Sequence, residues 1–250
     1  MLLSGVLLLS GCVENSRSKK GNTNTEKLDV TREKTNTDRT GTSSADIATP
    51  GSAREEATLY HILFFGDSIT AGYGIDPENA FPALIQSRIH DLGLPFRVTD
   101  GGLSGDTSAG GVSRISWLLR QRVDILVIEL GGNDGLRGIA TNVTRENLSR
   151  IIVRTREMYP DVQIILAGMQ VPPNLGHEYT SAFRELFREL SEEHDTALIP
   201  FILEGVGGHP ELNQPDQIHP TAAGHTIVAD NVWKVLAPIL MNFSAVGAES

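Results

Sequence analysis

A serine and a histidine far apart in the sequence could together carry out acyl transfer. Ser68 lies in a small polar turn after the apolar run 61–65, and His219 lies in the loop sequence Asp216-Gln217-Ile218-His219-Pro220. A serine hydroxyl attacks a carbonyl carbon at neutral pH only when a base within hydrogen-bond reach accepts its proton. The carboxylate of Asp216 can hold one imidazole nitrogen and leave the other free for that proton. Taken alone, Gly-Asp-Ser and Asp-initiated sequences also occur in ordinary turns.

Two glycine-rich segments between these motifs offer hydrogen-bond donors. Residues 101–108 read Gly-Gly-Leu-Ser-Gly-Asp-Thr-Ser, and residues 129–138 read Glu-Leu-Gly-Gly-Asn-Asp-Gly-Leu-Arg-Gly. Glycines let the backbone expose N–H groups to a ligand, and the side-chain amide of Asn133 is a further donor. Each segment by itself also fits a simple connection between two elements.

The four segments, in this order, resemble the SGNH branch of the GDSL hydrolases, a family named for its Ser, Gly, Asn and His residues. The resemblance implies that Ser68 is the nucleophile, His219 the general base and Asp216 the partner that orients it. It also implies an oxyanion hole, formed by the backbone N–H groups of Ser68 and Gly105 and by the side chain of Asn133.

The same resemblance implies where an acyl chain binds. Residues 168–176 correspond to the loop that lines the acyl pocket in related thioesterases. Leu136, in a segment that resembles a mobile flap, is expected to face the same pocket. The expected apolar wall consists of Met169, Val171, Pro172 and Leu175. The alternative interpretation of this segment is a simple proline-rich connection.

Short apolar runs alternate with longer amphipathic segments after residue 59. Strands are expected at 61–65, 96–99, 125–130, 162–167 and 197–200. Helices are expected at 80–92, 108–121, 145–159, 179–194 and 221–236. Near-continuous apolar strands indicate a parallel sheet that is buried on both faces, with helices on each side. The expected fold class is therefore α/β. It is a three-layer α/β/α sandwich with a central, mostly parallel five-stranded sheet, flavodoxin-like as in the SGNH hydrolases. Ligands bind such a sheet beyond the carboxyl ends of its strands.

The composition argues against a nucleic-acid partner. The formal net charge is −10 over 250 residues, and an acidic surface repels phosphate backbones. No cofactor is expected and no metal, because His219 and His225 match no common ligand spacing. His225 is expected to pack or to lie on the surface, and Asp67 to hold its turn. Two tryptophans in amphipathic helices are expected to anchor the core: Trp117 and Trp233. The chain is expected to be a monomer.

The N-terminal residues predict export and a lipid anchor. Residues 1–12 are uncharged, largely apolar and too short to span a bilayer, and they end in Leu-Ser-Gly-Cys. This ending resembles a bacterial lipobox, which predicts a signal peptide cleaved before Cys12 and lipidation of that residue; a plain secretory signal is the alternative. Residues 13–57 are polar and predict a disordered tether, which leaves 58–250 as the SGNH hydrolase domain. Val13, in place of Asp, favours the outer membrane.

The sequence thus predicts a serine ester hydrolase that is lipid-anchored in a bacterial cell envelope and faces the periplasm. Its expected partners are the membrane and a small-molecule acyl ester or thioester, such as an aryl ester, an acyl thioester or a lysophospholipid. Two alternatives stay open. One is a polysaccharide deacetylase or transacylase of the envelope, and the other is a binding lipoprotein that uses the same scaffold without turnover.

Overall fold

The computed structural model describes residues 59–247, which form one α/β unit. The predicted signal peptide, the lipidation site Cys12 and the predicted tether all lie outside the described residues. Five strands follow the five predicted apolar runs. They are β1 (Tyr60–Gly66), β2 (Phe96–Asp100), β3 (Ile125–Glu129), β4 (Gln163–Ala167) and β5 (Ala197–Ile199).

All five strands are parallel and lie in the order β2-β1-β3-β4-β5. The chain therefore places β2 on one side of β1 and β3 on the other. In a sheet of this order the connections from β1 and β3 leave in opposite directions, and a crevice opens between the carboxyl ends of these two strands. The segments that follow β1 and β3 are consequently neighbours at one end of the sheet.

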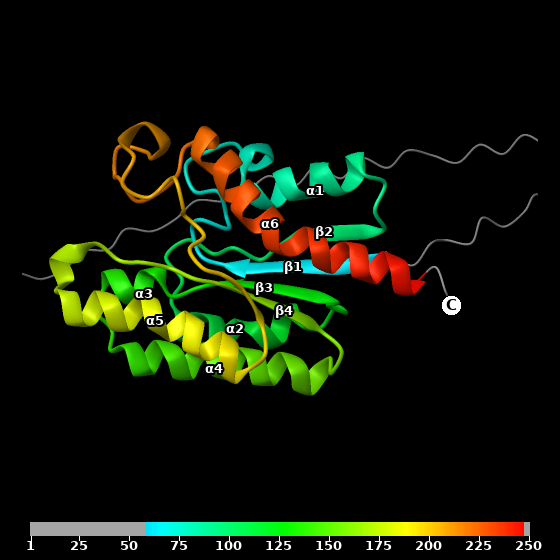
Figure 1. Ribbon diagram of the computed structural model, residues 1–250, viewed down its shortest axis with the longest axis horizontal. Helices are drawn as coiled ribbons and strands as arrows, with labels where there is room; N and C mark the ends of the chain where they lie inside the picture. The colour runs from blue at the N-terminus through cyan, green and yellow to red at the C-terminus, as the bar shows by residue number, and fades with distance from the viewer. Residues whose placement is uncertain (1–58, 248–250) are drawn as a thin grey trace, which may run out of the picture. The chain divides into compact units, whose positions relative to one another are not determined.

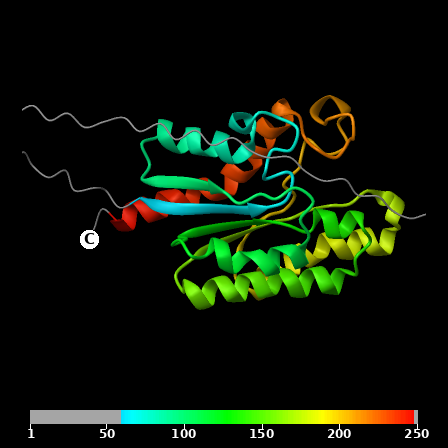
Figure 2. The same ribbon diagram turned by 180° about the vertical axis from the view of Figure 1, so that it is seen from behind.

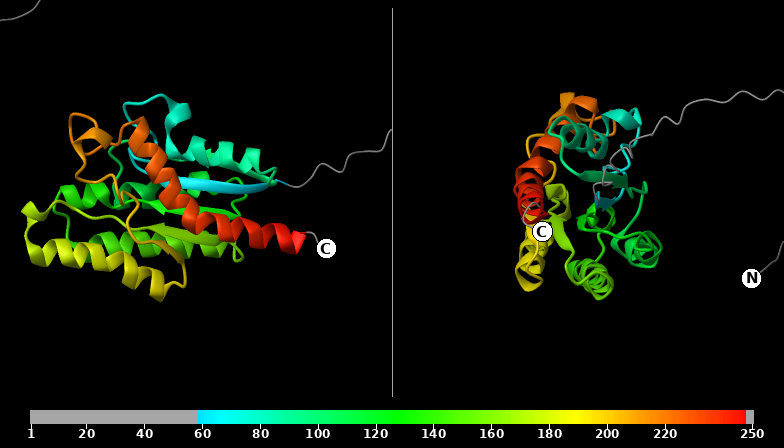
Figure 3. Two further views of the ribbon diagram at one scale, coloured as in Figure 1. Left: turned by 45° about the horizontal axis from the view of Figure 1, so that its top comes forward. Right: turned by 90° about the vertical axis from the view of Figure 1, so that its right-hand side faces the viewer.

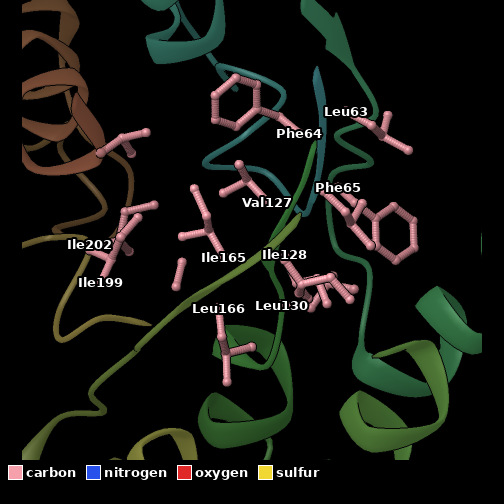
Figure 4. Packing of buried hydrophobic residues seen from close by; sticks show 14 of the residues in the cluster. Leu63, Phe64, Phe65, Val127, Ile128, Leu130, Ile165, Leu166, Ile199 and Ile202 are labelled. Atoms are coloured by element: carbon pink, nitrogen blue, oxygen red, sulfur yellow. The ribbon is translucent and has the colours of Figure 1, made fainter. Parts of the chain in front are cut away.

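The strand side chains form two apolar layers, because successive residues of a strand point to opposite faces. Phe64, Val127 and Ile165 are paired across three neighbouring strands and share one face. The next residues along these strands, Phe65, Ile128 and Leu166, share the other face, as Figure 4 shows. All six side chains are fully buried. This double burial explains why the central strands appear in the sequence as continuous apolar runs.

Helices cover both faces of the sheet (Figures 1 and 2). On the Phe64 face lie α1 (Phe81–Asp91) and α6 (Ala222–Gly247). On the opposite face lie α2 (Ser108–Leu118), α4 (Thr141–Met158) and α5 (His177–Glu193). Figure 3 shows the same three layers from two further directions. The shorter elements are α3 (Gly132–Leu136) and the 3₁₀ turns η1 (Pro77–Asn79), η2 (Pro173–Leu175) and η3 (Pro210–Leu212). The predicted three-layer fold is confirmed, and its five-stranded sheet is wholly parallel.

Tertiary contacts move two helix ends away from their predicted positions. Helix α4 begins at Thr141 rather than at residue 145, and the buried Thr144 hydroxyl in its first turn donates to the Asp134 carboxylate. Helix α2 ends at Leu118 rather than at 121. The hydroxyl of Tyr159 donates to the carbonyls of Leu119 and Gln121 just beyond this end. Such contacts come from another helix and leave no local signal.

The last helix and one tryptophan differ from expectation. A proline lacks the N–H that the helix ladder requires, yet α6 continues through Pro238 instead of stopping at 236. Beyond the proline, Phe243 packs its ring against Tyr60 and Phe96, with centroids 5.1 and 5.9 Å apart. Trp117 is wrong as a predicted core anchor, because 65% of it is exposed on α2. Trp233 packs, partly buried, against the core.

The aromatic contacts of Phe243 predict that the segment after Pro238 contributes to stability. Replacing Phe243 by Ala removes both ring contacts and should lower the free energy of unfolding by about 1–3 kcal/mol. Met241, which is exposed on the same segment, provides the matched control, and Met241→Ala should change stability by less than about 0.5 kcal/mol. Urea denaturation measures both values, and equal effects would contradict this packing role.

Candidate active site

Ser68 follows β1 directly and contacts His219, which lies in the loop before α6. Ser68 Oγ lies 2.9 Å from His219 Nε2, and His219 Nδ1 lies 2.6 Å from Asp216 Oδ2. An ionised carboxylate can only accept hydrogen bonds, so Nδ1 carries the hydrogen and Nε2 is free to accept from the serine hydroxyl. The structure therefore brings the three residues together as a Ser–His–Asp chain of hydrogen bonds.

Backbone N–H groups within residues 216–219 fix the position of the Asp216 carboxylate beside the imidazole. Asp216 Oδ1 accepts hydrogen bonds from the backbone N–H groups of Ile218 (2.9 Å) and His219 (3.0 Å). Gln217, between them, adopts φ +60°, a left-handed conformation that is uncommon for residues other than glycine. The hydrogen bonds from the His219 side chain and from these two N–H groups lower the pKa of Asp216 to about 2. Asp216 is therefore ionised at neutral pH.

Tyr73 and Gln214 join the serine and histidine loops, and the sequence analysis identified neither. The Tyr73 ring lies against the His219 ring with centroids 4.7 Å apart. Gln214 donates from its side chain to the Tyr73 carbonyl (2.6 Å) and from its backbone to the His219 carbonyl (2.7 Å). The two loops are about 140 residues apart in sequence, so this link depends on the tertiary fold and has no motif.

The three predicted oxyanion donors belong to the segments that follow β1, β2 and β3. Neither the Ser68 nor the Gly105 backbone N–H has a partner among the described residues. Gly105 has φ +80° and open space where a Cβ would lie, so its backbone angle rather than crowding favours glycine. Asn133, in the short helix α3 after β3, lies in the cavity wall beside Ser68. Its amide donates to Asp67 Oδ2 at 3.0 Å.

Two buried carboxyl groups lie behind these donors. Asp67 is 2% exposed and Glu129, the last residue of β3, is 1% exposed. Burial raises the pKa of Asp67 to about 6, although donors from Ile69 and Asn133 act in the opposite direction. Burial, followed by the neighbouring Asp67 charge, raises the pKa of Glu129 well above its usual value. Asp67 also fixes its own turn by accepting from the Ile69 N–H (3.0 Å), in agreement with its expected structural role.

Arg114 of α2 connects the backbone segments that carry Ser68 and Gly105. Its guanidinium donates to the carbonyls of Gly66 (2.8 Å) and Gly101 (2.7 Å), and to the Asp106 carboxylate (2.6 Å). The same group lies over the Phe65 ring, 4.2 Å from its centroid. A planar guanidinium can hold several acceptors in fixed directions, which an ammonium cannot. The sequence gives no sign of this role, because α2 shows no motif at Arg114.

A cavity of about 530 Å³ opens at Ser68, Asn133 and His219. Four of the five predicted pocket residues line it: Leu136, Met169, Val171 and Pro172. Leu175 does not line it: Pro173 at the start of η2 does, but Leu175 at its end is exposed. Gly105 lies on an exposed loop and is not part of the cavity wall.

The connection between β5 and α6 also lines the cavity, and no sequence motif marks it. It includes Phe201, Leu203, Gly207 and Gly208. The only signal is a run of apolar residues and glycines after a strand of three residues. Among residues 59–247, no group of three or more His, Cys, Asp or Glu side chains could hold a metal ion. Within the same range, no helix is long and apolar enough to cross a bilayer.

His225 lies behind the site, in the first turns of α6. It is 1% exposed, and its Nδ1 accepts from the Phe81 N–H at 3.2 Å. Burial lowers the pKa of His225 to about 4, so this imidazole is neutral at physiological pH. The expected packing role for His225 agrees with these contacts.

The fold is an α/β/α sandwich with a wholly parallel sheet. A Ser–His–Asp arrangement lies beside an apolar cavity at the carboxyl end of this sheet. This combination defines the class of protein as a hydrolase of acyl esters. Residues 64–227 match the model of the GDSL-like lipase/acylhydrolase family. The chain belongs to this family and is a carboxylic ester hydrolase. The resemblance to the GDSL hydrolases noted in the sequence is thereby confirmed.

Known proteins with similar sequences include two bacterial enzymes. The chain is 41% identical to esterase TesA of Pseudomonas aeruginosa over 187 residues, which cover 74% of this chain and 92% of that protein. It is 34% identical to thioesterase 1/protease 1/lysophospholipase L1 of Escherichia coli K12, over 72% of this chain and 84% of that protein. A crystal structure of TesA aligns with a TM-score of 0.69 at 42% identity, covering 71% of this chain and 98% of that one.

The raised pKa of Asp67 predicts a pH-dependent contribution to stability. The pKa of Asp67 is about 6 in the folded chain and 3.8 ordinarily. Between these two pH values the folded state therefore binds more protons than the unfolded state. Its stability must therefore fall as the pH rises through this interval. Asp67→Asn has no carboxyl group to titrate at this position. The difference in free energy of unfolding, wild type minus variant, should therefore fall by about 1–3 kcal/mol from pH 4 to pH 7. Urea denaturation across this range measures the difference, and parallel stability curves would contradict the prediction.

Proposed function

We propose that Ser68, His219 and Asp216 hydrolyse carboxylic esters and thioesters in two acyl-transfer steps. In the first step, His219 Nε2 takes the Ser68 proton as Oγ bonds to the carbonyl carbon of the substrate. The bond to the alcohol or thiol then breaks, and the leaving group takes the proton from His219. In the second step, water attacks the acyl-serine with His219 again as base, which releases the acid and restores the hydroxyl.

The oxyanion that forms in each step needs donors that are already in place. We assign this role to the Ser68 N–H and the Gly105 N–H, which are unpartnered in the described residues, and to the Asn133 amide. Asp216, held ionised by its hydrogen bonds, favours the positive charge that His219 carries during transfer. The observation that carries the proposal is the contact of Ser68 Oγ with His219 Nε2 at 2.9 Å in the wall of an apolar cavity.

The cavity supports a substrate with an apolar acyl group. It is lined by Met169, Val171 and Pro172 after β4 and by Phe201 and Leu203 after β5. These side chains can bury an acyl chain, which gains about 0.8 kcal/mol for each buried CH₂ group. The similarity to an esterase and to a thioesterase/lysophospholipase supports carboxylic esters, acyl thioesters and lysophospholipids as candidate substrates. The apolar walls argue against deacetylation of a polysaccharide, which needs a polar cleft.

The proposed location is the bacterial cell envelope, with a lipid on Cys12 as anchor. The lipobox-like end of residues 1–12 and the polar composition of 13–57 support this arrangement. Anchoring on the periplasmic side of the outer membrane would give the hydrolase domain access to lipid-derived substrates.

The mechanism predicts how three variants of the full-length protein hydrolyse p-nitrophenyl acyl esters. Ser68→Ala should abolish turnover, because no acyl-enzyme can form. Asn133→Ala should lower kcat about 10²–10³-fold, because one oxyanion donor is lost. Ser113→Ala changes a serine exposed on α2 and should leave kcat unchanged.

The chain length of the p-nitrophenyl ester tests the cavity in the same assay. Increasing acyl length should raise kcat/KM until the walls are filled. If a folded wild type releases no p-nitrophenol at any length, the ester hydrolase mechanism is contradicted. Binding of the acyl chain without turnover would then favour a binding lipoprotein, and release of acetate from envelope polysaccharide would favour the deacetylase alternative.

The proposed anchor predicts a membrane-bound protein whose attachment depends on Cys12. In a Gram-negative host the wild type should sediment with the membranes and release only in detergent, with a lipid adduct on its N-terminal peptide by mass spectrometry. Cys12→Ser should lack the adduct, whereas Ser16→Ala, a nearby control, should retain it. An unmodified Cys12 in the wild type would contradict the anchor.

A further inference from the structure

Glu129 and Asp67 form a buried pair that the proposed mechanism does not use. Glu129 lies opposite Gly66 in the pairing of β3 with β1. A Cβ at Gly66 would meet Glu129 Oε2 at 2.5 Å and Thr70 Oγ1 at 1.9 Å. The glycine of the Gly-Asp-Ser motif therefore makes room for this carboxyl group, directly behind the proposed nucleophile.

The donors around the pair leave one oxygen without a partner. Glu129 Oε2 accepts from the Thr70 hydroxyl (2.8 Å) and from the backbone N–H groups of Asp67 and Thr70, each at 3.2 Å. Asp67 Oδ1 accepts from the Ile69 N–H, and Oδ2 accepts from the Asn133 amide. Glu129 Oε1 is buried and has no such donor in the described part of the chain.

The two carboxyl groups are close neighbours, because the Asp67 N–H donates to Glu129 Oε2 at 3.2 Å, and hydrogen bonding from the Glu129 side chain is among the causes that lower the pKa of Asp67. Two ionised carboxylates have no hydrogen to share, so hydrogen bonding between the side chains requires a proton on one of them. Three of the four oxygens already accept from N–H or O–H groups. The fourth, Glu129 Oε1, is the place where a hydroxyl can donate without displacing a donor. A buried polar group that otherwise lacks a partner is costly, and a proton on Oε1 removes this cost.

We infer that Glu129 is a protonated positioning residue, which donates a hydrogen bond to the Asp67 carboxylate and thereby fixes the Asn133 amide. The inference rests on the proposed function, because it assigns Asn133 to the oxyanion hole. Asp67 Oδ2 binds one N–H of this amide, so the amide cannot flip, and its second N–H is free to face the cavity. The neutral Glu129 also limits the pair to one negative charge, which reduces repulsion of the oxyanion.

The surroundings of the pair agree with one proton at neutral pH. Burial and the Asp67 charge both raise the pKa of Glu129. The charge of His219, when present, acts on Asp67 in the opposite direction and favours its ionised form. No lysine or arginine side chain among the described residues hydrogen-bonds to either carboxyl group, so the pair has no cation to balance a second charge.

Infrared spectroscopy of the full-length protein tests the proton directly. At pH about 8, exposed carboxyl groups are ionised, so a carboxylic acid C=O band should come from a buried acid. The wild type and Ser68→Ala should both show this band, and Glu129→Gln should lose it. Glu157→Gln changes an exposed glutamate on α4 and should retain it. Should Glu129→Gln fail to fold, Asp67→Asn should shift the band by changing the acceptor. A wild type without the band overturns the inference.

Kinetics separate a positioning role from a purely structural one. The side chain introduced by Glu129→Gln carries an oxygen for the three donors and an N–H₂ for Asp67, so this variant should keep kcat within about threefold of wild type. Glu129→Leu removes the hydrogen bond and should lower kcat at least tenfold, by about as much as Asn133→Ala or less, with KM little changed. A fall in kcat for Glu129→Gln as large as for Asn133→Ala overturns the inference.

The infrared and kinetic results together separate this inference from the proposed function. If the wild type hydrolyses esters but shows no carboxylic acid C=O band, only this inference is overturned. If the wild type shows the band but hydrolyses no ester, the proton on Glu129 is supported and the proposed function is contradicted.

Discussion

The parallel pairing of β1 with β3 in the middle of the sheet is the constraint on which the site depends. Both strands are buried on both faces, so their registers are fixed by rows such as Phe64–Val127–Ile165. A slip by one residue would turn each apolar row toward the wrong layer. Because the strands are parallel, the residues that follow them emerge at one edge, and Ser68 and Asn133 meet there. The core itself thus places the proposed nucleophile and its proposed side-chain oxyanion donor.

The remaining groups reach the same edge on loops, which need polar contacts to hold them. Arg114 joins the loops after β1 and β2, while Tyr73 and Gln214 join the serine loop to the histidine loop. The Arg114 hydrogen bonds are partly buried, and in such surroundings a satisfied hydrogen bond is stronger and an unsatisfied one more costly. The hydrogen bond from Gln214 to the Tyr73 carbonyl is exposed to solvent. Together these contacts connect the loops to one another beside the apolar cavity.

The sequence predicted the elements and motifs that local chemistry determines. Buried parallel strands must be apolar, so the five strands could be found, and the Ser68, Gly105, Asn133 and Asp216–His219 segments carry recognisable residue types. Contacts between distant segments could not be found in this way. The wall from Phe201 to Gly208, the link through Arg114 and the helix that continues past Pro238 depend on partners far away in the chain. Leu175 and Trp117 were misplaced for a related reason, because apolar character alone does not determine which way a side chain faces.

The most direct test of the account is covalent labelling with a fluorophosphonate, followed by mass spectrometry of the intact protein and its peptides. This reagent reacts with a serine that is activated by a base, losing fluoride as the Oγ–P bond forms. The account predicts one adduct per chain, on the peptide that contains Ser68, and no adduct in His219→Ala. An adduct on another serine, or a folded wild type that stays unlabelled, would contradict the assignment of Ser68 and His219 as nucleophile and base.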